Sequence, residues 1–473
     1  MLSSHPAPWA AIVTMASITA AQPLDADLWV HLNTGRFIAR TGTMPYPDPF
    51  TFGAGDAIWT AHEWLPALAI HALITSAGVG LTTLAFGALM ALTWVVVERT
   101  LAAHGVGPWA RTAAIVLAAL PGIPFGGIRP LHAGVLMTVL IGALLLQHRR
   151  SGSRWIWLAP PLFLAWANLH GSFPVGIGLF GALAAELVWR RLGLPGSSEP
   201  VRTNPRRLAT AGVLSVAALF VNPAGARLLA QPFWQLGQTF RAFNSDWQPP
   251  ELWSATWWLF VVFLAGTGLA VGLGRRRVAP LLLAAVVALL WAGFGSRKLM
   301  VFAAALTPML LAHPLAGLAG PRIGGATWPT RGAALIAAGT ALGIALALAP
   351  RTLAGPFVTP MPVRARAMLA QAGPTSVFNT YHWGAYLTWQ LWPKSLVFID
   401  GRLDPFAERA LPAYLRISSL QPGWQAELAQ LDPEAIVLQT GAPLARSLVV
   451  DDDWRVAHRD VVATVFLPGR TGA

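Results

Sequence analysis

Residues 130–147 read PLHAGVLMTVLIGALLLQ, an apolar run without Asp, Glu, Lys or Arg that stops just before Arg149 and Arg150. A membrane-spanning helix needs about 20 mostly apolar residues, which is close to the length of this run. Runs of the same kind recur through the first 350 residues and alternate with short polar loops. The sequence therefore predicts an α-helical polytopic membrane protein.

The hydropathy pattern predicts about 11 transmembrane helices. They cover residues 7–23, 79–98, 109–125, 130–147, 155–169, 172–190, 208–222, 254–273, 278–294, 298–317 and 331–350. The stretch 64–78 is apolar but short, which favours an interfacial or re-entrant helix. The first run is alternatively a signal peptide, since Ala20 and Ala21 lie near a cleavage position, although no Lys or Arg precedes it.

The composition agrees with a membrane protein and excludes several other classes. Of the 473 residues, 55% are hydrophobic and 11% are charged. Soluble domains carry about 25% charged residues, roughly twice as many. The absence of Cys excludes disulfides and thiolate chemistry. A net charge of +13 would suit nucleic acid if the basic residues formed a single patch.

The basic residues instead follow the loops. If the first loop is outside, the inner loops carry fifteen Lys and Arg residues and the outer loops carry seven. This is the positive-inside bias of membrane proteins. It predicts a cytoplasmic N-terminus, an extracytoplasmic segment after Pro350, the lipid bilayer as partner and no nucleic acid.

Residues 351–473 have a different pattern. Short β-branched runs at 376–379, 395–400 and 435–439 alternate with helical periods, and two closing strands lie at 454–458 and 462–467. Such alternation favours a small α/β domain with a mostly parallel sheet and a terminal hairpin. We therefore divide the chain into a transmembrane helical domain, 1–350, with an acidic first outer loop (24–78), and an extracytoplasmic α/β domain, 351–473.

The first outer loop concentrates the scarce acidic residues. The first 350 residues contain ten carboxylates, and five lie between Asp25 and Glu63. Asp25 and Asp27 directly follow the first span, where together they would bind a divalent metal or supply a base. His31 lies one helical turn beyond Asp27. The alternative interpretation is a solvated loop that needs charges and turn formers.

Several motifs make the chain resemble a known class. They are Asp-x-Asp-Leu-Trp-x-His-Leu-x-x-Gly from Asp25, Pro-x-x-Asp-Pro-Phe ending at Phe50, His-Glu-Trp-Leu from His62, and residues 377–379, 383–387 and 397–402. Together they resemble bacterial membrane glycosyltransferases of the GT-C class, which includes protein O-mannosyltransferases and oligosaccharyltransferases. The likeness runs nearly end to end, although this chain has a short N-terminal segment and a small C-terminal domain.

The resemblance implies a function and a location. An acidic residue of the first outer loop is the catalytic base of that class, often beside a metal, and it maps onto Asp25 and Asp27. The donor is a sugar on a polyprenyl phosphate, and the extracytoplasmic acceptor is a glycan, lipid or protein. The implied place is the bacterial cytoplasmic (inner) membrane. Mg²⁺ or Mn²⁺ would be the metal, and no nucleotide cofactor is expected.

Cations at the outer face would bind the donor phosphate. The alternative is that they snorkel to lipid head groups. A polar turn at 168–172 would contact the sugar, or else cap its flanking helices. The candidate substrate-binding residues are His31, Arg36, Asp48, His62, Glu63, Arg129, His132, Asn168, His170, Arg297 and Lys298.

Two other functions compete with glycosyl transfer. A transporter of a small solute or lipid-linked saccharide would keep a carboxylate deep in a span. Glu186 is the nearest example, but it lies toward a helix end with Arg190 four residues on. A non-catalytic assembly protein is the third alternative. Because the carboxylates gather at the outer face, we favour an integral-membrane glycosyltransferase.

Overall fold

The computed structural model describes residues 5–57, 59–194, 201–237, 244–274, 278–318, 360–402 and 404–469. The chain forms two compact units. The helical unit comprises Met1–Gln22 and Gly80–Pro350, and the sheet unit comprises Pro23–Val79 and Arg351–Ala473. Hydropathy had assigned the loop 24–78 to the membrane part, whereas contacts group it with the C-terminal segment. The predicted span 331–350 lies outside the described residues.

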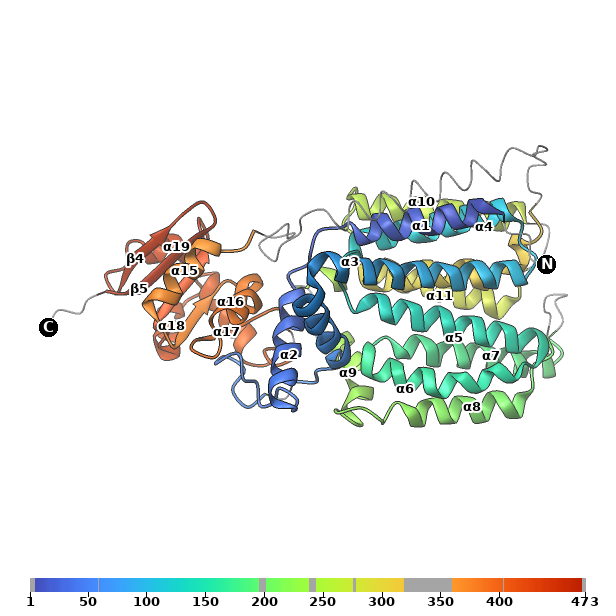
Figure 1. The fold of residues 1–473 in the computed structure, drawn as a ribbon, viewed down its shortest axis with the longest axis horizontal. Coiled ribbons are helices and arrows are strands. Elements are labelled where there is room, and N and C mark those ends of the chain that lie inside the picture. The colour runs from blue at the N-terminus through green and yellow to red at the C-terminus, as the bar shows by residue number, and fades with distance from the viewer. Residues whose placement is uncertain are drawn as a thin grey trace. The chain divides into compact units, whose positions relative to one another are not determined.

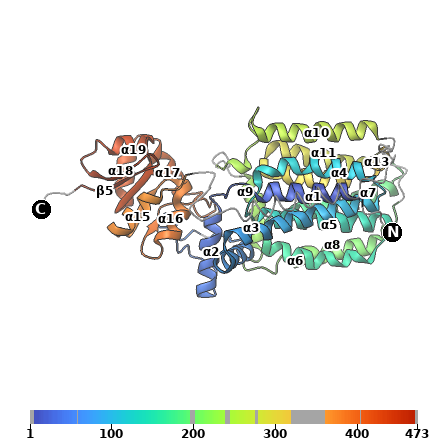
Figure 2. The same ribbon diagram turned by 45° about the horizontal axis from the view of Figure 1, so that its top comes forward.

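Each predicted span within the described residues coincides with helix. The helical unit contains α1 (Pro6–Ala20), the second part of α3 (Trp64–Ala103), α4 (Pro108–Ala119), η1 (Leu120–Phe125), α5 (Leu131–Ser151), η2 (Arg154–Leu158), α6 (Ala159–Leu169), α7 (Phe173–Arg191), α8 (Pro205–Ala218), α9 (Arg227–Gly237), η4 (Ser245–Trp247), α10 (Ala255–Leu273), α11 (Pro280–Gly295), α12 (Arg297–Leu310) and α13 (Ala312–Leu315). Figures 1 and 2 show α5, α6, α7 and α8 running side by side.

The exposed faces of these helices are apolar. In α10, for example, Leu269 and Leu273 are 62% and 63% exposed. Such a surface requires a lipid solvent, because water would not tolerate it. Among the described residues, α3, α5, α7 and α10 are long and apolar enough to cross a membrane, and α11 is a shorter apolar helix. The number of eleven spans stays a prediction.

A glycine divides α3. Gly78 has φ 77° and ψ 173°. Only glycine adopts this conformation readily, because it has no Cβ atom. The helix before Gly78 belongs to the sheet unit, and the helix from Gly80 belongs to the helical unit. The break therefore falls where the sequence separates the short apolar stretch 64–78 from the span 79–98.

Charged side chains inside the helical unit are paired. The Glu186 carboxylate accepts hydrogen bonds from Arg149 Nε at 2.7 Å and Arg149 Nη2 at 2.8 Å, and Arg190 adds contacts at 3.1 and 3.2 Å. The Glu186–Arg190 pair expected from the sequence is confirmed, and Arg149 of α5 joins it. Glu186 therefore links α5 to α7, and both of its carboxylate oxygens bind arginine.

The sheet unit contains one five-stranded sheet in the order β2-β1-β3-β5-β4. The strands are β1 (Ser376–Asn379), β2 (Leu396–Val397), β3 (Ala435–Gln439), β4 (Trp454–Arg459) and β5 (Ala463–Pro468). β1 pairs in parallel with β2 and β3, but β5 pairs antiparallel with β3 and β4. The terminal hairpin is confirmed, and the mostly parallel sheet is wrong. The last strand lies between β3 and β4 and runs antiparallel to both, so two of the four ladders are antiparallel.

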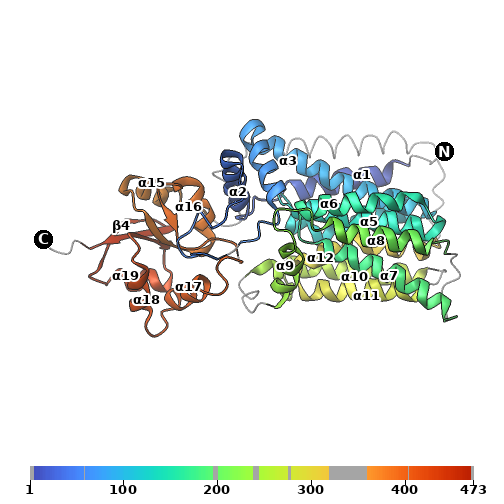
Figure 3. The same cartoon turned by 90° about the horizontal axis from the view of Figure 1, so that it is seen from below.

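Helices cover both faces of this sheet. Figure 3 shows α15 (Val363–Ala372) and α16 (Gly384–Leu391) on one face, and α17 (Ala410–Ser418), α18 (Trp424–Leu431) and α19 (Pro443–Leu448) on the other. A short η5 (Tyr381–Trp383) joins β1 to α16. The three apolar residues 435–437 at the start of β3 are buried. This burial is expected for a strand that is covered on both sides. The sheet is therefore the core of this unit.

The first loop packs onto this core. Its helix α2 (Leu28–Thr41) lies against α16, where the Trp29 and Tyr386 rings meet edge to face at 5.2 Å. The Asn33 side chain donates to the Ala385 carbonyl at 2.8 Å. Thr51 forms a parallel bridge with Val397 of β2. Residues distant in sequence thus build the surroundings of Asp25 and Asp27.

Candidate functional site

Asp25 and Asp27 form a tight turn at the start of α2. Asp25 Oδ1 accepts the backbone N–H of Asp27 at 2.8 Å. Leu24 and Leu28 are each only 1% exposed and anchor the turn, whereas Asp27 is exposed. Aspartate favours such turns because its side chain can bond the backbone two residues on. The turn thus brings the Asp25 carboxylate to the backbone of Asp27.

The Asp27 carboxylate meets the loop after β2. A Cβ atom placed on Gly401 would lie 3.1 Å from Asp27 Oδ1, so glycine permits this approach. The Tyr381 hydroxyl donates to the Gly401 carbonyl at 3.1 Å. Burial, then the charges of Asp27 and Asp400, raise the pKa of Tyr381. Tyr381 therefore stays protonated and keeps its hydrogen bond.

His382 faces the other carboxylate of the turn. Burial lowers the pKa of His382, and the charge of Asp25 acts in the opposite direction. Tyr381 and His382 lie between the motif segments 377–379 and 383–387 and are not among the residues predicted from the sequence. The sequence could have pointed to them only through their position between the motif residues Asn379 and Trp383. Their proximity to Asp25 and Asp27 arises on folding.

Three predicted residues come together at Glu63. Its Oε2 lies 3.8 Å from His31 Nε2, and its Oε1 lies 3.7 Å from His62 Nε2. All three side chains are at most 20% exposed. A carboxylate between two imidazoles can orient them and hold their charge. No group of three or more His, Cys, Asp or Glu side chains in the described part of the chain is arranged to hold a metal ion.

Asp48 is engaged by an internal ion cluster. Arg402 Nη1 and Nη2 donate to its two oxygens at 2.8 and 3.0 Å, and Thr51 donates to it as well. The same guanidinium donates from Nε to Asp400 Oδ1 at 2.8 Å. The three charged side chains are at most 4% exposed. The geometry thus assigns Asp48 to holding its loop on β2, and its predicted substrate contact stays a prediction.

Aromatic rings surround the same guanidinium. Arg402 Cζ lies 4.5 Å from the Trp59 ring centre and 5.4 Å from those of Phe50 and Phe406. Burial raises the pKa of Asp400 more than Arg402 lowers it, because one guanidinium serves two carboxylates. Asp400 and Arg402 therefore form a buried ion pair in the turn that follows β2.

Arg36 also has an internal role. Its Nη1 donates to the Trp389 carbonyl at 2.9 Å, and its Nη2 donates to the Asn33 side chain at 3.1 Å. Its guanidinium lies 4.4 Å from the Trp389 ring centre. Burial, then the Arg40 charge, lower the pKa of Arg36 to about 10, so it stays charged. Arg36 thus docks α2 on the end of α16, and its predicted substrate contact stays a prediction.

The predicted phosphate-binding cations gather in the helical unit. Arg129 Nη1 lies 3.0 Å from Asp246 Oδ2, and Arg297 Nε donates to the Ser245 carbonyl at 2.7 Å. Lys298 Nζ lies 5.4 Å from the Trp247 ring centre. Three cations thus surround residues 245–248, which include the carboxylate of Asp246. Since these residues come from three distant segments, only the fold brings them together.

The polar turn at 168–172 is tied into the helix packing. The Asn168 amide donates to the Leu164 and Val221 carbonyls, both at 2.9 Å. His170 Nδ1 lies 2.9 Å from the Ser172 hydroxyl. His132 Nε2 lies 3.1 Å from the Gly127 carbonyl. These contacts favour the helix-capping interpretation of Asn168 and give the two histidines internal partners.

Comparison with known proteins connects this fold to a class. No protein-family model and no curated protein sequence matches the chain. Its fold is similar to that of ArnT, a protein of known structure. The crystal structure of ArnT from Cupriavidus metallidurans bound to undecaprenyl phosphate matches with a TM-score of 0.53 and 15% identity, over 98% of this chain and 97% of that chain. ArnT in the apo state gives 0.52 and 14%, over 96% and 95%.

The Arg402 cluster predicts a strong effect on stability. Replacing Arg402 by Leu leaves two buried carboxylates without a cation, which should cost about 3–5 kcal/mol. Without the guanidinium both carboxyl groups favour the protonated form, so the loss should shrink as the pH falls from neutral toward about 4.5. Thermal unfolding in detergent at the two pH values measures this effect.

The matched control is Arg416→Leu. Arg416 pairs with Glu427, but its side chain is 46% exposed. Exposed ion pairs contribute little to stability, because water screens them. Equal unfolding temperatures of the Arg402 and Arg416 variants would contradict the structural role of the cluster.

Proposed function

We propose that this chain is an integral-membrane glycosyltransferase that moves a sugar from a polyprenyl-phosphate donor to an extracytoplasmic acceptor. The observation that carries the proposal is the gathering of Arg129, Arg297 and Lys298 around residues 245–248. The likeness to ArnT bound to undecaprenyl phosphate supports it. The proposed place is the bacterial inner membrane, with the N-terminus in the cytoplasm and the C-terminal domain outside.

The cation cluster suits the leaving group. When the bond between the sugar carbon and the phosphate oxygen breaks, the polyprenyl phosphate takes the bonding electrons and gains negative charge. Preorganised cations stabilise such developing charge. Asp246 orients Arg129 and removes one unit of charge, so the cluster keeps an excess of two positive charges. Trp247 beside Lys298 offers an apolar surface for the sugar or the lipid.

The acidic turn suits activation of the acceptor. An acceptor hydroxyl oxygen forms the new bond to the sugar carbon while its proton passes to a carboxylate. We assign this proton transfer to Asp27, because it is exposed and lies beside Gly401, whose carbonyl Tyr381 holds. Asp25 orients the turn through its bond to the Asp27 backbone.

Neighbouring groups complete the proposed acceptor site. Glu63, with His31 and His62, would hydrogen-bond the acceptor at a second point. Asp25 and Asp27 also offer the oxygen ligands that Mg²⁺ or Mn²⁺ prefers. A bound ion would lower the pKa of the acceptor hydroxyl.

Replacing the base should abolish transfer. A general base contributes about 10²–10⁴-fold to a rate, so Asp27→Asn should lower transfer by at least about 100-fold, with a smaller loss for Asp25→Asn. The assay follows a labelled sugar from a polyprenyl-phosphate donor in reconstituted vesicles. Asp56→Asn is the control, because Asp56 is an exposed carboxylate of the same loop.

Full activity in both the Asp25 and the Asp27 variants would reject the catalytic assignment. Solute uptake into vesicles that contain no lipid-linked donor would favour the transporter instead. Inserted protein in each variant is measured beforehand, so that loss of expression is not read as loss of chemistry.

Replacing a cation should weaken binding of the lipid phosphate. Lys298→Gln removes one charge and leaves the Arg129–Asp246 ion pair intact. A charge-assisted contact contributes about 1.5–3 kcal/mol. The Kd for polyprenyl phosphate should therefore rise by roughly 10–150-fold. Titration of the purified protein in nanodiscs measures it.

The control for the Lys298 variant is Arg227→Gln, which replaces an exposed arginine of α9. This variant removes the same unit of charge from a residue outside the proposed phosphate site, so its Kd should stay unchanged. An unchanged Kd for the Lys298 variant as well would contradict the phosphate role.

A further inference from the structure

An elongated apolar groove lies between α6, α7 and α8. Its volume is about 620 Å³, and its walls include Phe163, Phe180, Gly181, Gly212 and Val216. The described lining residues carry one charged side chain, that of Arg191, at the end of α7. The volume falls within the range of about 300–1,000 Å³ that is usual for ligand pockets. We call it the α7–α8 groove.

The groove has the dimensions of a lipid chain. Along α7 it extends from Ile177 to Arg191. At about 1.5 Å per residue this stretch is roughly 21 Å long. One leaflet contributes about 15 Å of hydrocarbon to a bilayer. Val188 and Val213 line the groove and are 56% and 69% exposed. A chain standing along the helix would cover these apolar side chains.

The end of the groove is basic. Arg191 is exposed there, and α8 begins nearby with Pro205, another lining residue, and the exposed Arg206. No Asp or Glu occurs in residues 187–194 or 201–237, and Glu199 between them lies outside the described residues. The carboxylate of Glu186 is already engaged by two arginines. The charge of this end therefore suits an anionic head group.

This end is opposite to the cations proposed to bind the donor. Arg129 lies just before the N-terminal end of α5. Arg149 lies near the C-terminal end of α5, where it bonds Glu186 of α7. Helix α5 has 21 residues. At the usual helical rise its length is about 30 Å, which is the thickness of the hydrocarbon core. Arg191 thus lies at the other membrane face from Arg129, and the donor lipid has no reason to place its phosphate there.

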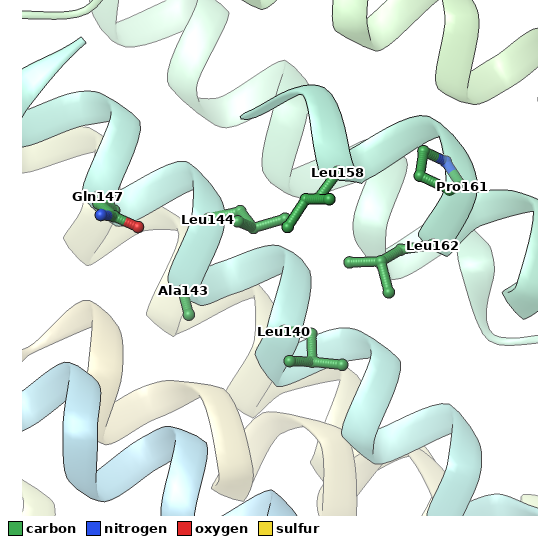
Figure 4. A pocket seen from close by; sticks show the side chains of 7 residues that line it. All are labelled: Leu140, Ala143, Leu144, Gln147, Leu158, Pro161 and Leu162. Atoms are coloured by element: carbon green, nitrogen blue, oxygen red, sulfur yellow. The ribbon is translucent and has the colours of Figure 1, made fainter. Parts of the chain in front are cut away.

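A second cavity provides a contrast. Figure 4 shows the side chains that line it, among them Leu140 and Leu144 of α5 and Leu162 of α6. Its volume is about 350 Å³, and Gln147 is the polar side chain of its described lining. This cavity has apolar walls without a charged end. The combination of length, apolar walls and a basic end belongs to the α7–α8 groove.

We propose that the α7–α8 groove binds an anionic phospholipid of the leaflet that faces the basic loops. One acyl chain lies along α7 and α8, and the head-group phosphate contacts Arg191, with Arg206 close by. Basic pockets between transmembrane helices at this face are typical sites for anionic lipids. The site is distinct from the proposed catalytic residues, so its test does not require glycosyl transfer.

Two glycines of α7 give a matched test. A Cβ atom at Gly181 or at Gly178 meets no atom within 4 Å, but only Gly181 lines the groove. Gly181→Leu therefore adds apolar atoms to the groove from a position that has room for a Cβ atom, and Gly178→Leu is its control. Arg191→Gln removes the head-group contact, and Arg99→Gln is its control, since Arg99 is 53% exposed and does not line the groove.

The full-length protein is reconstituted with phosphatidylglycerol, phosphatidylcholine or undecaprenyl phosphate, and bound lipid is counted by native mass spectrometry. The expected result is retention of one phosphatidylglycerol, lost by about 10-fold or more in Gly181→Leu and Arg191→Gln and kept in both controls. Equal retention in Gly181→Leu and Gly178→Leu would overturn the proposal. So would equal retention of phosphatidylcholine, or displacement of phosphatidylglycerol by undecaprenyl phosphate. Circular dichroism verifies that each variant is folded.

Discussion

The sheet unit depends on one buried guanidinium. Arg402 joins Asp48 of the first loop to Asp400 at the end of β2, and aromatic rings exclude water from the cluster. A buried charge is tolerated only when it is paired and hydrogen-bonded. Because Arg402 has partners on both segments, it fixes the loop that follows α2 to the sheet. The turn that carries Asp25 and Asp27 directly precedes α2, which Asn33 and Arg36 hold on α16.

Small and polar residues near the sheet have a packing reason. The Asn379 amide donates to the Ile399 carbonyl at 2.8 Å, and its oxygen accepts the Phe398 N–H at 3.0 Å. A Cβ atom on Gly384 would collide with the Ile399 carbonyl oxygen, so α16 can begin there only with glycine. These contacts shape the chain from Ile399 to Gly401, which forms the wall beside Asp27.

The carboxylates of the first 350 residues differ in role between the helical unit and the first loop. Glu186 is paired with arginines inside the helical unit, and Asp246 is paired with Arg129. Such pairs hold helices and loops together. Those of the first loop have a wider range of roles: Asp48 is structural, Glu63 gathers two histidines, and Asp25 and Asp27 form the turn. Clustering in sequence therefore located the candidate site but did not distinguish its members.

The sequence by itself determined the helices of the membrane part, most strands of the small domain, and the class of fold. These features depend on hydropathy, on local periodicity and on short motifs, which are written in neighbouring residues. Only the tertiary structure decided the grouping of the first loop with the C-terminal segment, the internal roles of Arg36 and Asp48, and the meeting of Arg129 with Asp246. Such contacts join residues far apart in the chain, and their partners are set by packing, which a local pattern does not contain.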